Sequence, residues 1–475
     1  MPAALPARTD LASQAAPPLS LGATARYWLR LGLISFGGPA GQVALMHAEL
    51  VERRRWLSER RFLHALNYAM VLPGPEAQQL ATYIGWLMHG IPGGLVAGGL
   101  FILPSLLLLI LLSAIYAVWG SLPLLSSVFM VLKPAVTAIV AQAAWRIGRR
   151  TLHTPALLAI ALLAFLGLAV LKLPFPLLLA LAALTGGLGC RFWPRAFVAD
   201  GGHRRHGSPE SDSTDVPGAQ ASNNIGTAQA FLHGDDTLAP AHARLDRRRA
   251  LRVLLAGLLA VVVPLALLSA IGGWDGLLAT MARFFSRVAV LSFGGAYAVL
   301  PYVAQGAVEQ HGWLGADQMI DGLALGESTP GPLIMVVTFV GFMAGWTSAV
   351  NAAQPEVAAL SLATAAALTV TWFTFLPSFL FILVGGPFVE ASRADHRLQG
   401  PLTAITAAVV GVIANLAVFF AGHVLWPQGA GGPFKAWALA LMLLGAWLLI
   451  ARRWPVLRLI AAAAAVGALT TPLGG

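Results

Sequence analysis

The sequence predicts an all-α polytopic membrane protein made of two inverted-topology repeats. Of its 475 residues, 57% are hydrophobic and only 11% are charged, and the mean hydropathy is +0.75. Soluble domains carry about 25% charged residues, so this composition excludes a soluble fold. Residues 26–75 recur without a gap at residues 283–332. The alternation of apolar and polar residues expected of a membrane barrel is absent.

Thirteen apolar windows can be placed along the chain. Each has about 20 residues, which is enough to cross a hydrocarbon core of about 30 Å as a helix. Because only helices and closed barrels satisfy the backbone in lipid, we expect every window to be helical. The windows lie near residues 21–46, 62–89, 91–116, 125–145, 154–172, 174–190, 250–272, 283–308, 318–346, 357–385, 401–423, 434–451 and 454–472.

Composition divides the chain into six segments. Residues 1–20 have no apolar stretch, so they do not form a secretory signal peptide. Residues 191–249 are polar, with arginines at both ends, which is typical of a solvated and disordered linker. The predicted segments are a cytoplasmic N-terminal tail (1–20), a first repeat (21–190), a cytoplasmic linker (191–249), an extra helix (250–272), a second repeat (273–423) and C-terminal helices (424–475).

Arginine-rich loops predict the orientation of the chain, because such loops stay on the cytoplasmic side. Counting crossings places the linker, the Arg146–Arg150 turn, the Arg393–Arg397 loop and the Arg452–Arg453 turn on one side. The single extra window at 250–272 then inverts the second repeat relative to the first. Many secondary transporters are inverted repeats of this kind, with binding sites near the membrane midplane.

The loop from Arg53 to Arg61 conflicts with simple counting. If the windows at 21–46 and 62–89 both cross fully, five arginines lie outside, while the matching loop, 310–318, lies inside without a Lys or Arg. Re-entrant hairpins broken at Gly37-Gly38-Pro39 and Pro73-Gly74-Pro75 would remove the conflict. Two kinked full crossings fit the lengths equally well, so both interpretations stay open.

The repeat preserves helix breakers. Proline inside a helix removes an amide donor and clashes with the preceding turn, and the interrupted helix exposes a new N-terminus with free N–H groups. Such an end binds anions, whereas small residues also serve tight helix packing. The predicted breaks contain Pro39, Pro73, Pro75, Pro330 and Pro332. The predicted substrate-binding residues at these breaks are Ser35, Gly37, Gly38, Gly74, Gln79, Ser292, Gly294, Gly295, Thr329 and Gly331.

Four arginines also persist through the inversion: Arg26 and Arg30 recur as Arg283 and Arg287. The positive-inside rule accounts for an arginine on one side of the membrane only, so it does not account for pairs conserved in both repeats. At spacing i, i+4 the two side chains share a helix face, and guanidinium groups bind oxyanions bidentately. We therefore add these arginines to the predicted anion site. Snorkelling from a helix start to the lipid headgroups is the competing explanation.

Two carboxylates lie at the breaks. Glu76 follows the first Pro-Gly-Pro and Glu327 precedes the second. Carboxylates inside a membrane are costly and are functional candidates, here for carrying a coupling proton. Capping of the following helix is the simpler role for Glu76. The lone Cys190 and the scattered histidines have no ligand spacing, so no metal or cofactor is expected, and no phosphate-binding loop for ATP occurs.

These motifs resemble the chromate ion transporter family. The resemblance covers nearly the whole chain, in its long two-domain form, and lies in Ser35-Phe36-Gly37-Gly38-Pro39, residues 72–83 and Glu327-Ser328-Thr329-Pro330-Gly331-Pro332. It implies chromate export across the bacterial inner membrane, driven by the proton motive force and giving chromate resistance. The second repeat departs from the first, with Ala296 in place of Pro39 and Leu333 in place of Glu76. The two halves of the site are therefore not chemically equivalent.

We interpret the chain as a secondary transporter of a tetrahedral oxyanion and not as an enzyme. Its expected partners are chromate or a sulfate-like anion, a coupling proton and the lipid bilayer, without nucleic acid. A homodimer stays open. The alternatives are a carrier for sulfate or another inorganic anion, an intramembrane enzyme acting on a lipid phosphate, and a passive channel. The motifs do not distinguish chromate from sulfate, because both are tetrahedral dianions.

Overall fold

The computed structural model describes residues 19–192, 242, 246–293, 295–391, 399–429 and 431–470. All regular elements within these ranges are helices, which confirms the predicted all-α class. Seven helices are long and apolar enough to cross a membrane, judged by length and composition, and three shorter ones are apolar. The predicted linker lies almost entirely outside the described residues.

The two repeats contain matching series of helices. The first consists of α1 (Leu21–Ile34), α2 (Gly38–His47), the π-helical η1 (Ala48–Arg53), α3 (Glu59–Val71), α4 (Glu76–Trp119), α5 (Pro123–Thr151), α6 (Pro155–Ala169) and α7 (Phe175–Phe192). Helix α9 (Arg247–Gly272) precedes the second series. That series consists of α10 (Leu277–Leu291), α11 (Ala296–Ala304), η3 (Gln305–Gln310), α12 (Ala316–Ser328), η4 (Leu333–Met335), α13 (Val336–Asn351), α14 (Glu356–Ala391), α15 (Gln399–Leu425), α16 (Ala436–Ile450) and α17 (Val456–Leu469).

Several helix starts are fixed by side-chain caps. The hydroxyls of Ser20, Ser58 and Thr154 accept hydrogen bonds from amides in the first turns of α1, α3 and α6, and the Asp246 carboxylate does so for α9. These caps satisfy N–H groups that have no partner inside the helix. The sequence thereby sets where these segments begin.

The predicted break segments fold as re-entrant hairpins. After the break at Ser35 the chain reverses, so that the ring of Trp56 packs on Tyr27 of α1 with 5.0 Å between centroids. In the second repeat the chain reverses after Ser292, and Trp313 stacks on Phe285 at 6.0 Å. Full crossings would place these rings at opposite ends of the bundle. The hairpin interpretation of the Arg53–Arg61 loop is therefore supported over kinked crossings.

A second reversal follows each Pro-Gly-Pro. Helix α4 has non-helical backbone at His89 and Gly90, so that Gly85 lies against Gly93 and Ala97. In the second repeat, α13 and α14 form the same antiparallel pair. Relative to the first repeat, α13 extends six residues further, α14 begins eight residues earlier, and the turn has two more residues. A second repeated block, in which Leu103-Pro104-Ser105 recurs as Leu376-Pro377-Ser378, is shifted by 273 positions where the first block is shifted by 257, and these differences account for the extra 16 residues.

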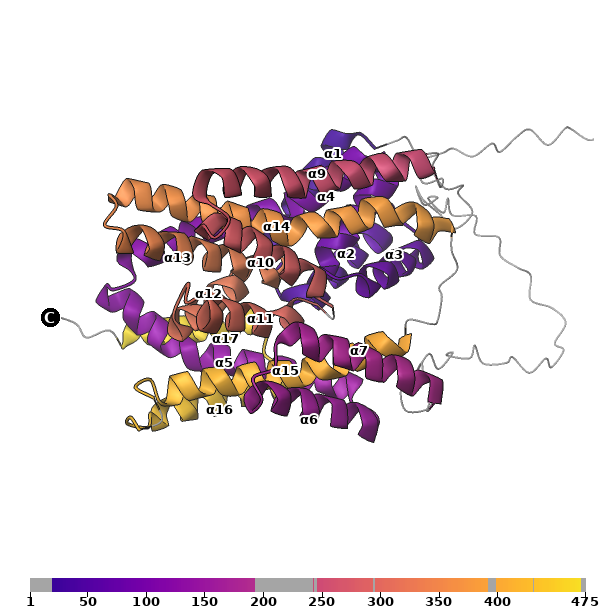
Figure 1. Cartoon of the computed structure of the whole chain (residues 1–475). Helices are drawn as coiled ribbons and strands as arrows, with labels where there is room; N and C mark the ends of the chain where they lie inside the picture. Colours follow the sequence, from indigo (N-terminus) through magenta and orange to yellow (C-terminus); the bar gives the residue numbers. More distant parts are fainter. Residues whose placement is uncertain are drawn as a thin grey trace, which may run out of the picture.

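Helix α9 relates the two repeats. Gly90 lies near Arg249, and Val253 packs on the core beneath α1 and α4, so the first repeat begins at the end of the bundle where α9 starts. Helix α10 begins directly after α9 ends, 26 helical residues or about 39 Å away. The repeats therefore start from opposite ends of the bundle, as the inverted topology requires. Figure 1 shows α9 along the outer edge of the molecule.

The last helices of each repeat pack on the other repeat. Helices α6 and α7 lie against α15, whereas α16 and α17 lie against α5 (Figure 1). Close contacts stabilise this exchange, since Gly411 of α15 packs on Ala161 of α6, and Gly467 of α17 packs on Val128 of α5. The two halves are therefore interlocked.

Candidate functional site

The four helix breaks meet inside the bundle and hydrogen-bond across the repeats. The amide of Gly74 donates to the carbonyl of Ser292 at 3.0 Å, and the amide of Gly331 donates to the carbonyl of Ser35 at 2.8 Å. The first break of each repeat is thus paired with the second break of the other. The place where the four breaks meet is called the crossing below. These two bonds are related by the repeat, because Ser35 matches Ser292 and Gly74 matches Gly331.

Glycine is required at both donor positions. Gly74 and Gly331 have φ angles of 135° and 104°, which side chains rarely adopt. A methyl group on Gly331 would lie 2.7 Å from Cβ of Ser105, and one on Gly74 would collide with the hydroxyl of Ser378. Ser105 and Ser378 are the matched serines of the two Leu-Pro-Ser segments. Each serine therefore packs against the glycine of the Pro-Gly-Pro loop in the other repeat.

Two buried glutamine side chains of the first repeat add hydrogen bonds at the crossing. Nε2 of Gln42 donates to the carbonyl of Gly331 at 2.5 Å and to that of Ser35 at 3.3 Å, and Nε2 of Gln79 donates to Pro73 at 2.7 Å. Oε1 of both glutamines and the hydroxyls of Ser105 and Ser378 are buried without a hydrogen-bond partner. Unpaired buried polar atoms are rare and costly, so this crossing is a candidate ligand site.

Side-chain hydroxyls at the breaks bond within their own helices. Ser35 donates to Leu31 at 2.5 Å, Ser292 donates to Ala289 at 2.9 Å, and Thr329 donates to Gly326 at 3.0 Å. The hydroxyls at the crossing without a partner are therefore those of Ser105 and Ser378. Of the other predicted positions, Gly37, Gly38 and Gly295 have positive φ, Pro39 lies in the first turn of α2, and Gly294 lies outside the described residues.

The two predicted carboxylates have different surroundings. Glu76 begins α4 and faces the other repeat, since Oε1 lies 3.4 Å from where a Cβ on Gly295 would be. Glu327 accepts a hydrogen bond from the hydroxyl of Tyr297 at 2.6 Å, and the Arg146 guanidinium of α5 lies beside both groups. Arg146 was interpreted from sequence only as a marker of orientation.

The four repeated arginines lie away from the crossing. Arg26 and Arg287 are exposed, and Arg30 lines a surface cavity with Glu49, Arg53 and Arg54. The Arg283 guanidinium lies 4.1 Å above the Trp274 ring and 3.6 Å from Oδ1 of Asp275. Arg30 precedes Ser35 by five residues and Arg287 precedes Ser292 by five, which is about 7 Å of helix rise in each case. The structure thus brings the breaks together without the arginines.

A second polar cluster lies where α5 meets α12. Nζ of Lys133 is 2.9 Å from Oδ1 of Asp317 and 3.9 Å from Oδ2 of Asp321, and the Tyr116 hydroxyl donates to Asp321 at 2.8 Å. The cluster borders a cavity of about 350 Å³ that also contains His423 and Lys435. The repeat does not predict this cluster, because Thr406 occupies the position of the second repeat that matches Lys133.

The two break hairpins are docked differently. Helix α12 packs on α5 and α11 packs on α15, whereas the matching contacts of α3 with α15 and of α2 with α5 are at most marginal among the described helices. The consequence is visible in matched residues: Ile320 of α12 is fully buried, while Leu63 of α3 is 45% exposed. The repeats therefore share a topology and differ in conformation.

Comparison with known proteins agrees with these features. The chromate transporter family model matches residues 23–187 and 279–468. A chromate transport protein of Pseudomonas aeruginosa is 31% identical, with 86% of this chain and 83% of that protein aligned. A chromate transport protein of Cupriavidus metallidurans and a probable one of Synechococcus elongatus are each 27% identical, with coverages of 84–86%. No solved structure matches. The chain belongs to the chromate transporter family, and is a transport protein and not an enzyme.

Proposed function

We propose that this protein is a secondary active transporter that exports chromate from the cytoplasm, driven by the proton motive force, and thereby confers chromate resistance. The observation that carries the proposal is the reciprocal pairing of the four breaks, Gly74 with Ser292 and Gly331 with Ser35. Inverted repeats with broken helices at their interface are the usual architecture of secondary transporters. The substrate named for its relatives supplies the anion.

The anion site is proposed to form at this crossing. Backbone amides at the interrupted helix ends offer hydrogen-bond donors and partial positive charge to an oxyanion without adding a titratable group. Arg26, Arg30, Arg283 and Arg287 would add full charges on the way to the crossing. Arg30 and Arg287 lie nearest to it along their helices.

Coupling is proposed to involve Glu76 or Glu327. Glu327 is hydrogen-bonded to Tyr297 and adjoins Arg146, so one carboxylate is held between a donor and a cation inside the bundle. Because export driven by inward proton movement requires that the proton and the anion bind in turn, the carboxylate is proposed to carry the proton on the half of the cycle in which the site holds no anion. Proton and anion movement would thus be linked through one residue.

The transport cycle is proposed to exchange the docking of the two hairpins. In the described state the α11–α12 hairpin is docked on α5 and α15, and the α2–α3 hairpin makes no comparable contact with these two helices. Because the repeats are inverted, the opposite arrangement would open the other side of the membrane. The end of the bundle where α7 ends and α9 begins is assigned to the cytoplasm of the inner-membrane protein, since the Arg53–Arg61 and Arg146–Arg150 segments lie there.

Everted membrane vesicles test substrate and direction together. We expect an imposed proton gradient to drive chromate accumulation inside everted vesicles, and excess sulfate to compete weakly. Accumulation of sulfate in preference to chromate would make the protein a sulfate carrier. Equilibration without accumulation against a gradient would indicate a channel and contradict active transport.

Substituting the repeated arginines is expected to weaken chromate binding. A charge-assisted hydrogen bond contributes about 1.5–3 kcal/mol, so Arg30→Gln or Arg287→Gln should raise the half-saturating chromate concentration about tenfold or more. Arg26→Gln and Arg283→Gln should act in the same direction. Initial rates over a range of chromate concentrations measure the effect. Arg150→Gln, at the exposed end of α5, is the control. Unchanged saturation curves for all four variants would remove the arginines from the site.

Replacing Glu327 with glutamine is expected to uncouple transport. The amide keeps the shape of the side chain but cannot exchange a proton, so gradient-driven accumulation should fall at least tenfold while chromate exchange between the two sides continues. Glu356→Gln, at the exposed start of α14, is the matched control. If Glu327→Gln accumulates chromate as the parent does, Glu76 becomes the remaining candidate. Normal coupling in Glu76→Gln as well would contradict the proposal.

A further inference from the structure

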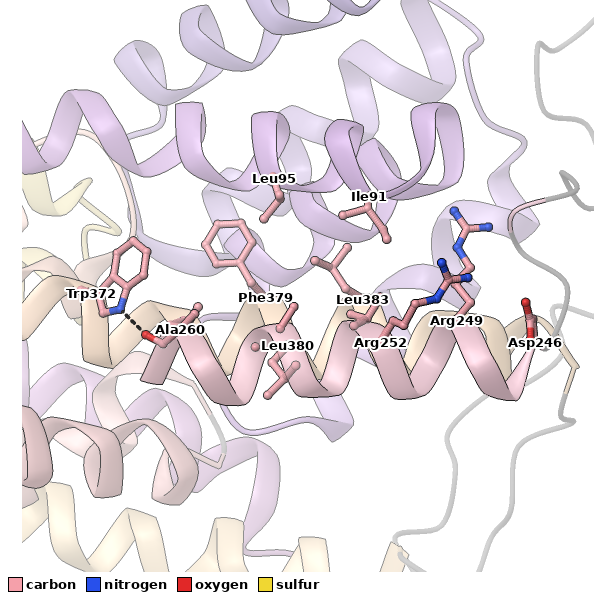
Figure 2. Close-up of a pocket in the computed structure, with 14 residues that line it drawn as sticks. Ile91, Leu95, Asp246, Arg249, Arg252, Ala260, Trp372, Phe379, Leu380 and Leu383 are labelled. Carbon is pink, nitrogen blue, oxygen red and sulfur yellow. Dashed lines mark hydrogen bonds between the residues drawn. The ribbon is translucent and has the colours of Figure 1, made fainter. Parts of the chain in front are cut away.

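A groove opens on the outside of the bundle between α4, α9 and α14. Its volume is about 750 Å³. Along its length it is lined by apolar side chains, which include Ile91, Leu95 and Phe379 (Figure 2). Arg249 and Arg252 lie together at the end where α9 begins. The groove is therefore apolar along its walls and charged at one end, where Asp246 lies with the two arginines.

The far end of the groove is closed by a contact between α9 and α14. Nε1 of Trp372 donates to the carbonyl of Ala260 at 3.0 Å (Figure 2). One turn earlier, Gly257 packs so closely on Leu380 that a methyl group there would collide with it. No residue of α9 is buried, so these contacts and the packing of Val253 hold the helix on the outer surface of the bundle.

The length of the groove matches one leaflet of a bilayer. Ala260 follows Arg252 by eight residues and Arg249 by eleven, which is about 12–16 Å of helix rise. Half of a hydrocarbon core of about 30 Å is about 15 Å. An acyl chain that enters beside the arginines would therefore reach Trp372 near the middle of the membrane.

The two arginines are available to an anion. Asp246, the nearest carboxylate, accepts a hydrogen bond from the amide of Arg248 at 2.9 Å as the cap of α9. Nη1 of Arg249 donates to the carbonyl of His242 at 3.3 Å. Within the described ranges, no salt bridge joins Arg249 or Arg252 to a carboxylate. Guanidinium groups bind phosphate bidentately, and basic clusters next to a membrane helix attract anionic lipids.

We infer that the groove binds an anionic phospholipid, with its phosphate at Arg249 and Arg252 and one acyl chain along α9 and α14. A zwitterionic lipid offers the same chain but no net charge, so the arginines select the headgroup. A second copy of this chain would bring apolar helices to the groove, yet would leave the arginines unpaired. An anionic phospholipid provides both an acyl chain for the apolar walls and a phosphate for the two arginines.

A bound lipid would act on the transport site through α14. Leu376 and Phe379 line the groove. Ser378, between them, faces inward and packs on Gly74 at the crossing of the breaks. Phe379 also lies against Gly98 of α4. The lipid would therefore contact the outer side of the turn of α14 whose inner side packs on Gly74 of the first Pro-Gly-Pro loop.

Titration of the purified full-length protein with dioleoyl phosphatidylglycerol tests this inference. Native mass spectrometry should detect one retained phosphatidylglycerol, and phosphatidylcholine should be retained at least tenfold more weakly. The double substitution Arg249→Gln/Arg252→Gln should remove that preference. Ala256→Phe, which fills the groove and leaves both arginines, should reduce retention of either lipid. Arg149→Gln/Arg150→Gln, at the end of α5 and outside the groove, is the matched control.

Three outcomes would overturn the inference: equal retention of the two lipids, phosphatidylglycerol retention unchanged by Arg249→Gln/Arg252→Gln, or a dimer that Ala256→Phe dissociates without any effect on lipid. A variant that unfolds is recognised by loss of its monodisperse elution, and the milder single substitution Arg252→Gln then replaces it, with a smaller loss of preference expected. These readouts do not depend on transport, so they are separate from the tests of the proposed function.

Discussion

Gly331→Ala and Gly74→Ala are each expected to reduce chromate transport at least tenfold. Both glycines have positive φ angles, and side chains in such conformations cost about 1–3 kcal/mol. The added methyl would also push against Ser105 or Ser378, and so displace the amide that pairs the two repeats. Initial rates of chromate uptake into everted vesicles, normalised to the amount of protein in the membrane, measure the effect.

Two matched controls separate this effect from a general loss of glycine. Gly22 in α1 and Gly99 in α4 have open space where a Cβ would be and no positive φ, so alanine there should leave transport near the parental rate. Ser105→Gly removes the atom nearest to the new methyl in Gly331→Ala and should restore part of the activity. Normal transport by Gly331→Ala, in a fully inserted protein, would show that the crossing of the breaks is not required.

Much of this fold could be predicted because local chemistry determines it. Pro73, Gly74 and Pro75 cannot continue a helix, and this motif, the Gly37-Gly38 pair and their repetition predict all four breaks. The contrast between the arginine-rich 53–61 loop and the 310–318 loop, which has no Lys or Arg, indicated hairpins as an alternative to kinked crossings. In both cases the deciding property, a missing amide or a fixed charge, belongs to the residue itself.

The partners at the crossing could not be predicted in the same way. Ser105 and Ser378 meet the breaks because α4 and α14 pack across the two repeats, and Gln42 of α2 does so through its bond to Gly331 of the other repeat. No local pattern reports these contacts. The repeated Leu-Pro-Ser segment was the one available signal. Arg146 was missed because a turn rich in arginine serves equally well to orient the chain. The repeated arginines were noticed, yet their spacing on a helix face does not reveal what that face contacts.

Locking the docked hairpin is expected to stop transport completely. Asp317 of α12 and Lys133 of α5 form an ion pair across the docked interface. In a Cys190→Ser background, Lys133→Cys/Asp317→Cys should react with a short bis-methanethiosulfonate reagent that bridges the two helices. Because the α11–α12 hairpin must leave α5 in the proposed cycle, the bridged protein should transport no chromate, and reduction should restore the rate.

The single-cysteine variants Lys133→Cys and Asp317→Cys control for modification without a bridge. Each carries the reagent on one helix only, so each should keep most of its activity after treatment. Full transport by a quantitatively bridged double variant would mean that this interface stays closed throughout the cycle. The exchange of hairpins would then be excluded.

The most direct test of the account concerns the contact that the repeat predicts and the described state lacks. Arg60 matches Asp317 and Thr406 matches Lys133, so the alternative state should bring Arg60 of α3 beside Thr406 of α15. The measurement is cross-linking of Arg60→Cys/Thr406→Cys in Cys190→Ser vesicles, before and after chromate and a proton gradient are supplied. The account predicts that this cross-link increases during transport while that of Lys133→Cys/Asp317→Cys decreases. No cross-link between α3 and α15 under any condition, with the α5–α12 cross-link unchanged, would contradict it.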